Sequence, residues 1–334
     1  MKALVYTGPN SLVFRDEPDA VPRYDEVVVK VDAVGICGSD MHAYHGHDSR
    51  RPAPLILGHE AAGIAMTGRL QGRRVTINPL VTCGACAFCL DGRSHLCSSR
   101  QIISMLPRPG AFAELVCIPE QNLVEIPEGF DIVKAALAEP VAVSYHAVQL
   151  GLRASPRPST SLVAVVLGGG AIGLASALVL AMAGCRSIHV AEPNAARRTT
   201  VRKAGPFNAY EPGATCEPLA ASVDLVIDAV GAENTREAAC RLVKPGGVIV
   251  HIGLLPGSVG VDVRKLTLQE VTFLGSYCYT MVDFRETVAA LAAGQLGALD
   301  WVEERPLRDG AAAFKAIDDG KTAAAKIVLR PTHF

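Results

Sequence analysis

Four cysteines that could together hold one metal ion lie within a single short segment of the chain. They follow the spacing Cys83-x2-Cys86-x2-Cys89-x7-Cys97. Zn²⁺ in structural sites favours a closed tetrahedral set of such thiolates. Because four thiolates leave no open coordination position, we expect this zinc to stabilise the loop and to take no part in chemistry. An iron–sulfur cluster can use the same four ligands and is the rival interpretation.

A second set of possible ligands mixes three side-chain chemistries. Cys37 lies in a glycine- and histidine-rich stretch, and His59 and Glu60 follow it as a dipeptide. A thiolate, an imidazole and a carboxylate can bind Zn²⁺ and still leave a position for substrate. Zinc there would act as a Lewis acid on an alcohol or carbonyl oxygen. Glu139 is a further candidate carboxylate. Spacing alone also fits a buried thiol at Cys37, a surface pair at His59 and Glu60, and a helix N-terminal acid at Glu139.

A glycine-rich turn predicts a dinucleotide site. Residues 168–173 read GGGAIG, directly after the uninterrupted apolar run Leu162–Leu167 and at the start of a predicted helix. Such a run is typical of a parallel strand buried on both faces. Gly168 permits the tight turn, Gly170 lets the backbone approach a pyrophosphate, and Gly173 allows close helix–strand packing. The helix N-terminus then offers N–H groups to the phosphates.

The choice of dinucleotide depends on an acidic residue further along. Glu192 ends the next predicted strand, nineteen residues after Gly173. A carboxylate there accepts hydrogen bonds from the ribose hydroxyls and repels a 2′-phosphate, which favours NAD. Arg197 is close enough in sequence to bind a 2′-phosphate, so NADP is the less favoured alternative. Ile172 and Val230 are further expected cofactor contacts.

The pattern of predicted secondary structure changes near residue 158. The elements that must position these groups therefore fall into two parts of the chain. Short apolar or alternating runs before that point predict strands, followed by one helix. Those runs are Met1–Tyr6, Leu12–Phe14, Glu26–Val34, Arg73–Ile77 and Ala111–Cys117, and the helix is Ile132–Leu150. Strands and helices alternate after Pro158, which predicts βαβ units in a doubly wound sheet. A last strand is predicted over Lys326–Leu329.

Composition excludes several classes of protein. The chain has 334 residues, enough for two domains, and it is 49% apolar and 19% charged, which argues against disorder. Its net charge of −1 disfavours nucleic-acid binding. The uncharged stretch from Pro158 to Cys185 is broken by the glycine triplet, so we expect no membrane span. The first residues lack an apolar signal region, and the clustered cysteines favour a reducing compartment, so we expect a cytoplasmic protein.

Several motifs together resemble the zinc-dependent medium-chain dehydrogenase/reductase family, which includes alcohol, polyol and threonine dehydrogenases. The matching segments are GICGSDMHAYHG (35–46), LGHEAAG (57–63), CGACAFCLDGRSHLC (83–97), AEPVAVSYHA (138–147) and GGGAIG (168–173). The resemblance covers essentially the whole chain. One departure is the short MTGRLQG connection after GHEAAGIA, where most relatives carry a longer hairpin.

The resemblance implies an α/β fold in which one domain is discontinuous. A β-rich, GroES-like catalytic domain is expected from residues 1–147 and 281–334. A Rossmann domain with a doubly wound parallel sheet is expected from residues 148–280. The family also implies a homodimer or a homotetramer.

The resemblance further assigns roles to single residues. Cys37 and His59 are the implied catalytic zinc ligands, and Glu60 is the implied adjacent carboxylate that binds zinc directly or by exchange. Glu139 occupies the position where polyol-type members carry a zinc-proximal glutamate. Asp40 resembles the carboxylate that orients the histidine ligand. Ser39 and His42 resemble a relay that takes the substrate proton to solvent.

We therefore expect an NAD-preferring enzyme with one catalytic and one structural zinc, which oxidises a secondary alcohol, favoured as a polyol or sugar-derived alcohol. A threonine-type amino-alcohol dehydrogenase is the competing enzyme. A zinc-ribbon interaction module fused to a nucleotide-sensing domain is the non-enzyme alternative, and a zinc-free quinone reductase would lack the cysteines. The expected neighbours of the substrate are Tyr44, His45, Arg50, Phe112 and Tyr279.

Overall fold

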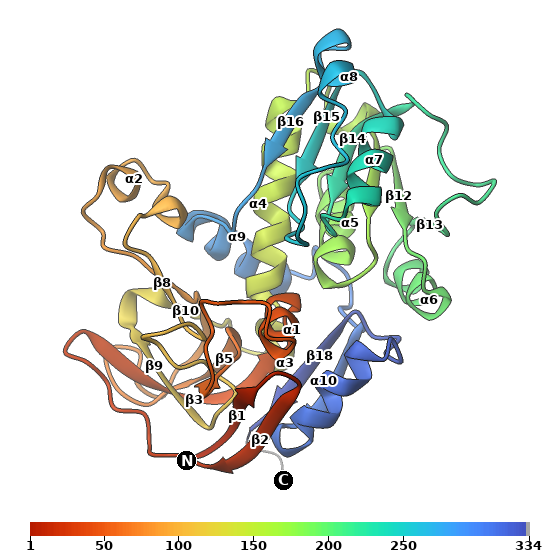
Figure 1. Cartoon of the computed structure of the whole chain (residues 1–334). Coiled ribbons are helices and arrows are strands. Elements are labelled where there is room, and N and C mark those ends of the chain that lie inside the picture. The colour runs from red at the N-terminus through yellow and green to blue at the C-terminus, as the bar shows by residue number, and fades with distance from the viewer. Residues whose placement is uncertain (332–334) are drawn as a thin grey trace.

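A computed structural model describes residues 1–331 of the chain. The molecule has two lobes, and the long helix α4 (Ala138–Ala154) runs from one into the other (Figure 1). The lower lobe in this view holds the N-terminal strands together with the last strand, β18 (Lys326–Arg330), so residues from both ends of the chain build it. The upper lobe holds the central part of the sequence.

A seven-stranded sheet forms the framework of the lower lobe. Its strand order is β10-β6-β5-β3-β18-β17, and β9 also pairs with β3. β18 pairs antiparallel with β3 and parallel with β17, so the C-terminal segment completes a sheet begun by the N-terminal one. The strands of this sheet are β3 (Glu26–Gly35), β5 (Glu60–Ala65), β6 (Arg74–Ile77), β9 (Leu115–Pro119), β10 (Leu123–Glu125), β17 (Val302–Pro306) and β18.

Smaller elements surround this framework. A three-stranded sheet has the order β2-β1-β4, and a two-stranded one pairs β7 with β8. Their bounds are β1 (Lys2–Gly8), β2 (Ser11–Asp16), β4 (Leu55–Ile56), β7 (Leu80–Val81) and β8 (Gln101–Ile102). The helices of this lobe are α1 (Gly38–Tyr44), α2 (Ala87–Leu90), α3 (Ile132–Ala135) and α10 (Gly310–Asp318), with the 3₁₀ turns η1 (Ser94–Leu96), η2 (Glu120–Asn122) and η4 (Leu307–Asp309).

The upper lobe confirms the predicted doubly wound sheet. Its strands are all parallel and lie in the order β13-β12-β11-β14-β15-β16. From β11 the chain first adds strands on one side of the sheet and then, from β14, on the other side, as in dinucleotide-binding folds. The strands are β11 (Val163–Leu167), β12 (Ser187–Ala191), β13 (Asn208–Tyr210), β14 (Val223–Asp228), β15 (Val243–His251) and β16 (Thr272–Gly275). The helices are α5 (Ala171–Met182), α6 (Ala195–Ala204), α7 (Glu233–Leu242), α8 (Val263–Leu268) and α9 (Met281–Ala292), with the 3₁₀ turn η3 (Ser159–Ser161).

The single helix predicted over Ile132–Leu150 is wrong, because the structure has α3 and α4 there instead. Pro140 explains the break. Its ring clashes with the carbonyl of the residue four positions earlier, Ala136, in a continuous helix, and it has no N–H to donate. The chain therefore ends α3 before Pro140 and starts α4 with this proline in its first turn, where no donor is needed. The predicted domain boundary at 147/148 falls inside α4 and stays a prediction.

Two further expectations differ from the structure. The strand predicted over Ala111–Cys117 lies later, at β9, because Gly110 to Ala113 bond instead to the β1 and β4 region. The helix α1, which begins directly after Cys37, is not among the elements predicted from the sequence. Glycine and polar residues in that segment suggested a loop, although Asp40 accepts a hydrogen bond from the Cys37 amide and so caps the helix.

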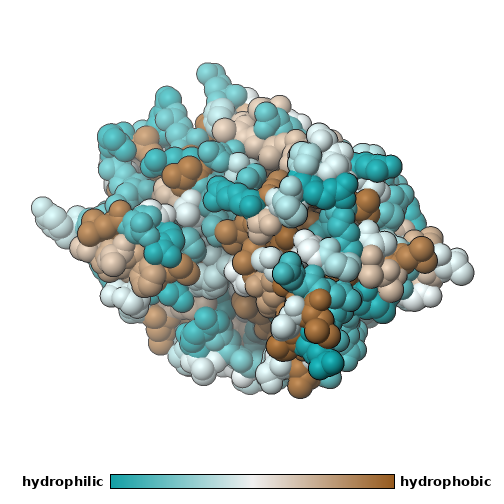
Figure 2. Space-filling view, turned by 90° about the horizontal axis from the view of Figure 1, so that it is seen from above, coloured by the Kyte–Doolittle hydropathy of each residue, from teal (hydrophilic) through white to brown (hydrophobic). Residues whose placement is uncertain are grey.

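No helix in residues 1–331 combines the length and the apolar character that crossing a membrane requires. Seen from above, the surface is a mosaic in which hydrophobic patches alternate with hydrophilic residues (Figure 2).

Candidate metal and cofactor sites

The four clustered cysteines converge, as their spacing predicts. They lie on a loop that projects from the lower lobe at α2 (Figure 1), and their sulfur atoms all fall within 4.8 Å of one another. The Sγ atoms of Cys83 and Cys97 are 3.5 Å apart, and those of Cys83 and Cys89 are 3.9 Å apart. A tetrahedral zinc with four thiolates has sulfur–sulfur separations of about 3.8 Å. The donor set and its spacing therefore fit a structural zinc.

Cys37, His59 and Glu60 form the second converging group, with their ligand atoms also within 4.8 Å of one another. Cys37 lies at the N-terminus of α1, and Glu60 opens β5. Glu60 faces Gly35 across the sheet, where a Cβ atom would collide with the Glu60 carboxylate. Glycine at this position therefore leaves the space that the carboxylate occupies.

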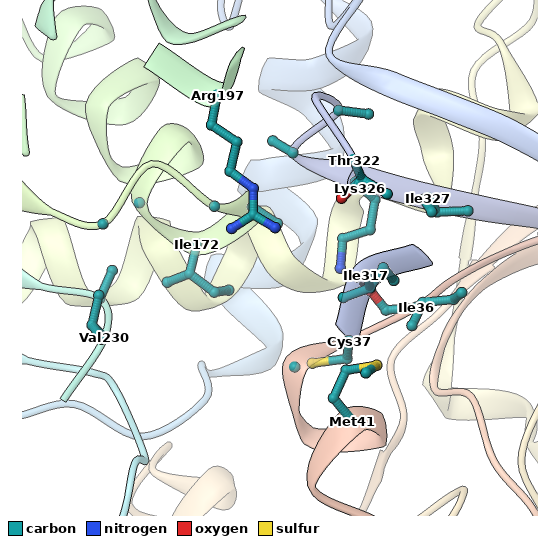
Figure 3. Close-up of a pocket in the computed structure, with 18 of the residues that line it drawn as sticks. Ile36, Cys37, Met41, Ile172, Arg197, Val230, Ile317, Thr322, Lys326 and Ile327 are labelled. Carbon is teal, nitrogen blue, oxygen red and sulfur yellow. Dashed lines mark hydrogen bonds between the residues drawn. The ribbon is translucent and has the colours of Figure 1, made fainter. Parts of the chain in front are cut away.

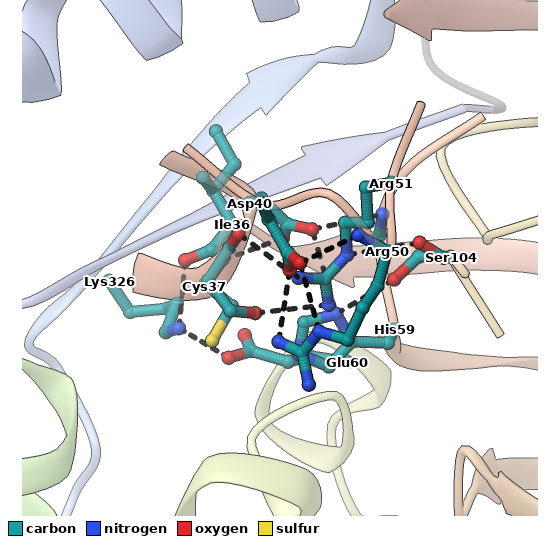
Figure 4. Close-up of polar contacts among 12 residues, drawn as sticks. Ile36, Cys37, Asp40, Arg50, Arg51, His59, Glu60, Ser104 and Lys326 are labelled. Atoms are coloured by element: carbon teal, nitrogen blue, oxygen red, sulfur yellow. Dashed lines mark hydrogen bonds and ion pairs between the residues drawn. The ribbon is translucent and has the colours of Figure 1, made fainter. Parts of the chain in front are cut away.

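The Glu60 carboxylate is fully buried, and its two oxygens differ in their partners. Oε1 accepts a hydrogen bond of 2.7 Å from Lys326 Nζ, which also donates to the Ile36 carbonyl at 2.8 Å (Figure 4). Oε2 has no hydrogen-bond partner among the described residues. A buried oxygen without a partner is costly, so Oε2 fits a cation held with Cys37 and His59.

Lys326 is a buried partner of Glu60 that the sequence alone does not indicate. Its side chain is 3% exposed and that of Glu60 is 0% exposed. Burial opposes the charged form of the lysine, but the Glu60 carboxylate outweighs it and raises the pKa of Lys326. The only signal in the sequence is a lysine at the start of an apolar strand, KIVL, which alone suggests a strand end in solvent.

His59 is held in place by Asp40 and Ser104. Its Nδ1 atom lies 3.6 Å from Asp40 Oδ1 and 3.4 Å from Ser104 Oγ. Asp40 is fully buried and accepts the Cys37 amide at 3.0 Å, so one carboxylate supports both Cys37 and His59. The sequence predicted this role for Asp40, whereas nothing in the sequence around Ser104 indicated its place.

The structure does not bring Glu139 into the group of three candidate ligands. Its carboxylate accepts a hydrogen bond of 3.0 Å from the Tyr279 hydroxyl. Burial raises the pKa of Glu139 to about 7, and the nearby Glu60 adds to the effect. The charge of Glu60 therefore acts on Glu139, but the hydrogen-bond partner of the Glu139 carboxylate is the Tyr279 hydroxyl.

Ser39 and His42 lie three residues apart on α1, and residues three apart are neighbours on a helix surface. The Ser39 hydroxyl is 3.4 Å from the guanidinium of Arg51, a buried arginine that also bonds the Ser104 carbonyl. His42 is partly buried, and this burial lowers its pKa. Their predicted relay role stays a prediction.

One cavity of about 320 Å³ joins the two halves of the candidate site. The cofactor residues predicted from the sequence all line it, namely Gly168, Gly170, Ile172, Gly173, Glu192, Arg197 and Val230. Cys37, Glu60 and Lys326 line its other side. Figure 3 shows Arg197 reaching into the cavity toward Lys326, with Ile172 and Val230 on the side of the glycine turn.

The glycine turn fits a dinucleotide in detail. Gly173 packs against the turn so closely that a Cβ atom would collide with the Gly168 carbonyl, whereas Gly170 has open space beside it. Glu192 accepts hydrogen bonds of 2.8 Å from the amides of Gly169 and Asn194. Its carboxylate is thereby fixed at the end of β12, next to the turn.

The expected neighbours of the substrate differ in burial, since two aromatic residues lie in the core and two charged or titratable residues lie nearer the surface. Tyr44 and Phe112 are buried and pack against Phe314 in the lower core, with ring centroids 5.4 and 5.9 Å from it. His45 pairs with Asp318 at 2.8 Å. Arg50 is exposed, and its Nε atom donates a hydrogen bond of 2.9 Å to Asp48 Oδ1.

Comparison with known proteins identifies the family. A family model described as "Alcohol dehydrogenase GroES-like domain" matches residues 23–128, and one described as "Zinc-binding dehydrogenase" matches residues 171–293. L-Galactonate-5-dehydrogenase of Escherichia coli (strain K12) is 31% identical, covering 89% of both chains. A probable D-xylulose reductase A of Neosartorya fischeri is 28% identical, covering 96% of this chain and 94% of the relative.

A solved structure is similar over nearly the whole chain. It is a protein from Sinorhizobium meliloti 1021 described as a zinc-binding dehydrogenase bound to NADP, with a TM-score of 0.87 and 30% identity over 99% of each chain. The chain therefore belongs to the zinc-dependent medium-chain dehydrogenase/reductase family, and it is an oxidoreductase. This confirms the GroES-like and Rossmann fold class, with zinc and a nicotinamide dinucleotide as the cofactors of the family.

Proposed function

We propose that this enzyme oxidises a secondary hydroxyl group of a polyol or sugar-derived alcohol to a ketone with NAD. The observation that carries the proposal is the single cavity lined by the glycine turn on one side and by Cys37 and Glu60 on the other. A dinucleotide that bound along the turn would reach the side of the cavity that Cys37 and Glu60 line. Both sequence relatives named above act on sugar-derived alcohols or ketones by their names, which supports this class of substrate.

The side chains around the cavity have separate tasks in this proposal. Zinc held by Cys37, His59 and Glu60 would polarise the substrate hydroxyl, and NAD would accept the hydride. Asp40 and Ser104 keep the His59 ring oriented, and Lys326 holds Oε1 of Glu60, which would leave Oε2 for the metal. Ser39 takes the hydroxyl proton and passes it toward His42, whose lowered pKa favours the neutral, proton-accepting form at neutral pH.

We propose NAD as the preferred dinucleotide. The Glu192 carboxylate beside the turn is suited to accept the ribose hydroxyls and to repel a 2′-phosphate. Arg197 lines the same cavity, and its buried Nε atom has no hydrogen-bond partner in residues 1–331, so it can meet a phosphate oxygen of the cofactor. Because the S. meliloti protein is described as bound to NADP, turnover is measured with NAD and with NADP, and a higher kcat/KM for NADP would overturn this preference.

We also propose that the enzyme works in the cytoplasm as a homodimer or homotetramer. Ligand thiolates such as those of the four-cysteine loop persist in a reducing compartment. β16 is an outer strand of the upper sheet, and the exposed apolar residue Leu268 ends the helix α8 just before it. An open strand edge and exposed apolar groups favour association. Light scattering of the purified enzyme measures the number of subunits.

Metal analysis and an activity panel test the proposal together. We expect two zinc ions per chain, and NAD-coupled turnover on at least one polyol or sugar-derived alcohol in a panel that includes amino alcohols and simple alcohols. Cys37→Ser should remove one zinc and abolish turnover while the other zinc stays bound. Ser39→Ala should slow turnover strongly with both zincs retained. Turnover confined to amino alcohols, or none on any secondary alcohol, would overturn the proposed substrate class.

A further inference from the structure

A second cavity, of about 180 Å³, lies where segments that are distant in sequence meet. The region of β7 and the four-cysteine loop contribute to its walls, together with η2 and the first turns of α9 (Figure 1). It shares no lining residue with the cofactor cavity within residues 1–331, and it is smaller than the roughly 300–1,000 Å³ of pockets for drug-sized ligands. Its polar lining includes Asn78, Thr82, Ser94, Gln121, Asn122 and Arg285.

Asn78 is a buried amide that has donors to spare. Its Oδ1 accepts the Leu80 amide at 3.0 Å, which fixes the direction of the side chain. Its Nδ2 carries two N–H groups, and the partner of this atom among residues 1–331 is Met281 Sδ at 3.8 Å. A thioether is a weak acceptor, whereas buried donors in native proteins are normally well paired. Asn78 can therefore donate to a ligand in the cavity that it lines.

The neighbouring polar side chains add further donors to a wall that is held in place. The hydroxyls of Thr82 and Ser94 form no hydrogen bond in the part of the chain that the structure describes, so both are free to donate to a ligand. Asn122 Nδ2 donates to the carbonyls of Asn78 and Leu80, at 2.8 and 2.6 Å, and so fixes the backbone that carries Asn78.

Arg285 supplies the charge of this lining. It is exposed, and it forms no ion pair with any described residue. The two acids of α9 have other partners, since Asp283 bonds to His146 at 2.8 Å and Glu286 to the Tyr145 hydroxyl at 2.7 Å. No carboxylate of residues 1–331 lines the cavity, so a guanidinium without a counter-charge lies among N–H and O–H donors.

A small anion that accepts several hydrogen bonds fits this set of groups. Every oxygen of a phosphate ion accepts hydrogen bonds, and guanidinium groups bind phosphate through charge-assisted contacts. We propose that the cavity is a site for a free phosphate ion, bound by Arg285 and Asn78 and by the hydroxyls of Thr82 and Ser94. The small volume favours the free ion over a phosphate ester.

The site adjoins the candidate catalytic group through Tyr279. Tyr279 is buried and lines this cavity, and its hydroxyl donates to the Glu139 carboxylate at 3.0 Å. A phosphate ion there would also join the four-cysteine loop to α9. Because a ligand that binds only the folded form stabilises it, phosphate should raise the melting temperature of the enzyme.

Calorimetric titration of the zinc-loaded enzyme with sodium phosphate tests the site, at constant ionic strength and with NADH in excess. NADH is added because the helix N-terminus at the glycine turn could itself bind phosphate. We expect one phosphate per chain, displaced by sulfate, which has the same tetrahedral shape. The melting temperature should be higher in phosphate than in chloride of the same ionic strength. Phenyl phosphate carries the same group on a body too large for the cavity, and binding as strong as that of the free ion would overturn the choice of the free ion.

Two variants and a matched control locate the ion. Arg285→Gln should weaken phosphate binding at least about tenfold, because it removes a charge-assisted contact. Asn78→Asp keeps an acceptor for the Leu80 amide but places a negative charge in the lining, so it should abolish binding. Arg264→Gln is the control, because Arg264 is an exposed arginine on α8 outside the cavity, and its removal should leave the affinity unchanged. Zinc content and melting temperature are measured for every variant.

The possible results separate this site from other places where phosphate could bind. No binding by the NADH-saturated enzyme overturns the inference, and so does binding that survives Arg285→Gln. Binding that is lost in Cys37→Ser assigns the ion to the catalytic zinc and likewise overturns it. Arg285 is exposed, so Arg285→Gln decides the question even where Asn78→Asp does not fold. The titration does not use turnover, and its result is therefore independent of the proposed alcohol oxidation.

Discussion

Replacing Lys326 by methionine removes one partner of a fully buried ion pair and keeps the length and apolar body of the side chain. The Lys326–Glu60 contact is 2.7 Å, and both side chains are inaccessible to solvent. Breaking such a pair leaves an uncompensated buried charge, which costs about 3–5 kcal/mol. Removing both charges in Lys326→Met/Glu60→Gln should return the protein to within about 1 kcal/mol of the wild type, because an uncharged pair leaves no buried charge.

The single tryptophan of the chain provides the assay. Trp301 is 3% exposed, and its carbonyl accepts the amide of Ala325, the residue before Lys326. Its neighbour Val302 pairs with Lys326 across β17 and β18. Denaturant unfolding followed by tryptophan fluorescence therefore reports the part of the sheet that carries the ion pair. It is measured on metal-free enzyme, in which no zinc compensates Glu60, for the wild type, both single variants and the double variant.

The coupling free energy from this cycle is the decisive quantity. We expect it to be about 3 kcal/mol, since most of the loss in Lys326→Met disappears when Glu60 is also neutralised. A Lys326→Met protein as stable as the wild type, or a double variant whose loss equals the sum of the single losses, would show that Lys326 does not hold Glu60.

Three further predictions concern the cofactor turn, the upper-lobe helix and the cysteine loop. Gly173→Ala should lower the melting temperature and weaken NAD binding because its Cβ collides with the Gly168 carbonyl, whereas Gly170→Ala should weaken NAD binding alone; equal melting losses would contradict this. Burial would raise the pKa of Asp283, but hydrogen bonds from His146 and Thr280 hold it at about 2. Its ionised form thus stabilises the fold above its unfolded pKa of 3.8 by about 2 kcal/mol, and this is lost as pH falls toward 2, so unfolding curves of the wild type and Asp283→Asn should converge in acid. Cys89→Ser should lose one zinc and retain the other, by metal analysis. Loss of both zinc ions would show that the two metal sites do not bind independently.

The parts of the site that are local in sequence could be predicted. The glycine turn, its strand and its helix are contiguous, so backbone sterics and hydrophobic pattern determine them together, and Gly168 and Gly173 lie where the motif places them. The four cysteines also close within one loop. Asp40 was predicted by the family resemblance alone, and the structure places its carboxylate beside the Cys37 amide and the His59 ring.

The parts that depend on distant contacts could not be predicted. Lys326 meets Glu60 across 266 positions of sequence, and Arg100 meets Tyr277 across 177. No local pattern encodes either contact, since each requires the two lobes and the returning C-terminal strands to be in place. Glu139 shows the converse, because its position in the sequence predicted nearness to the metal but not its hydrogen bond to Tyr279.

The way in which β18 completes the lower sheet has a consequence for the order of folding during synthesis. The upper sheet, from β11 to β16, uses one continuous stretch of chain and can close as soon as that stretch has left the ribosome. The lower sheet has to wait until Lys326 arrives, because Val34 and Gly35 at the end of β3 lack their partner β18 and Glu60 lacks the lysine that pairs with it. The cofactor half is thus complete before the metal half, and an unfinished chain exposes a bare strand edge that chaperones can recognise.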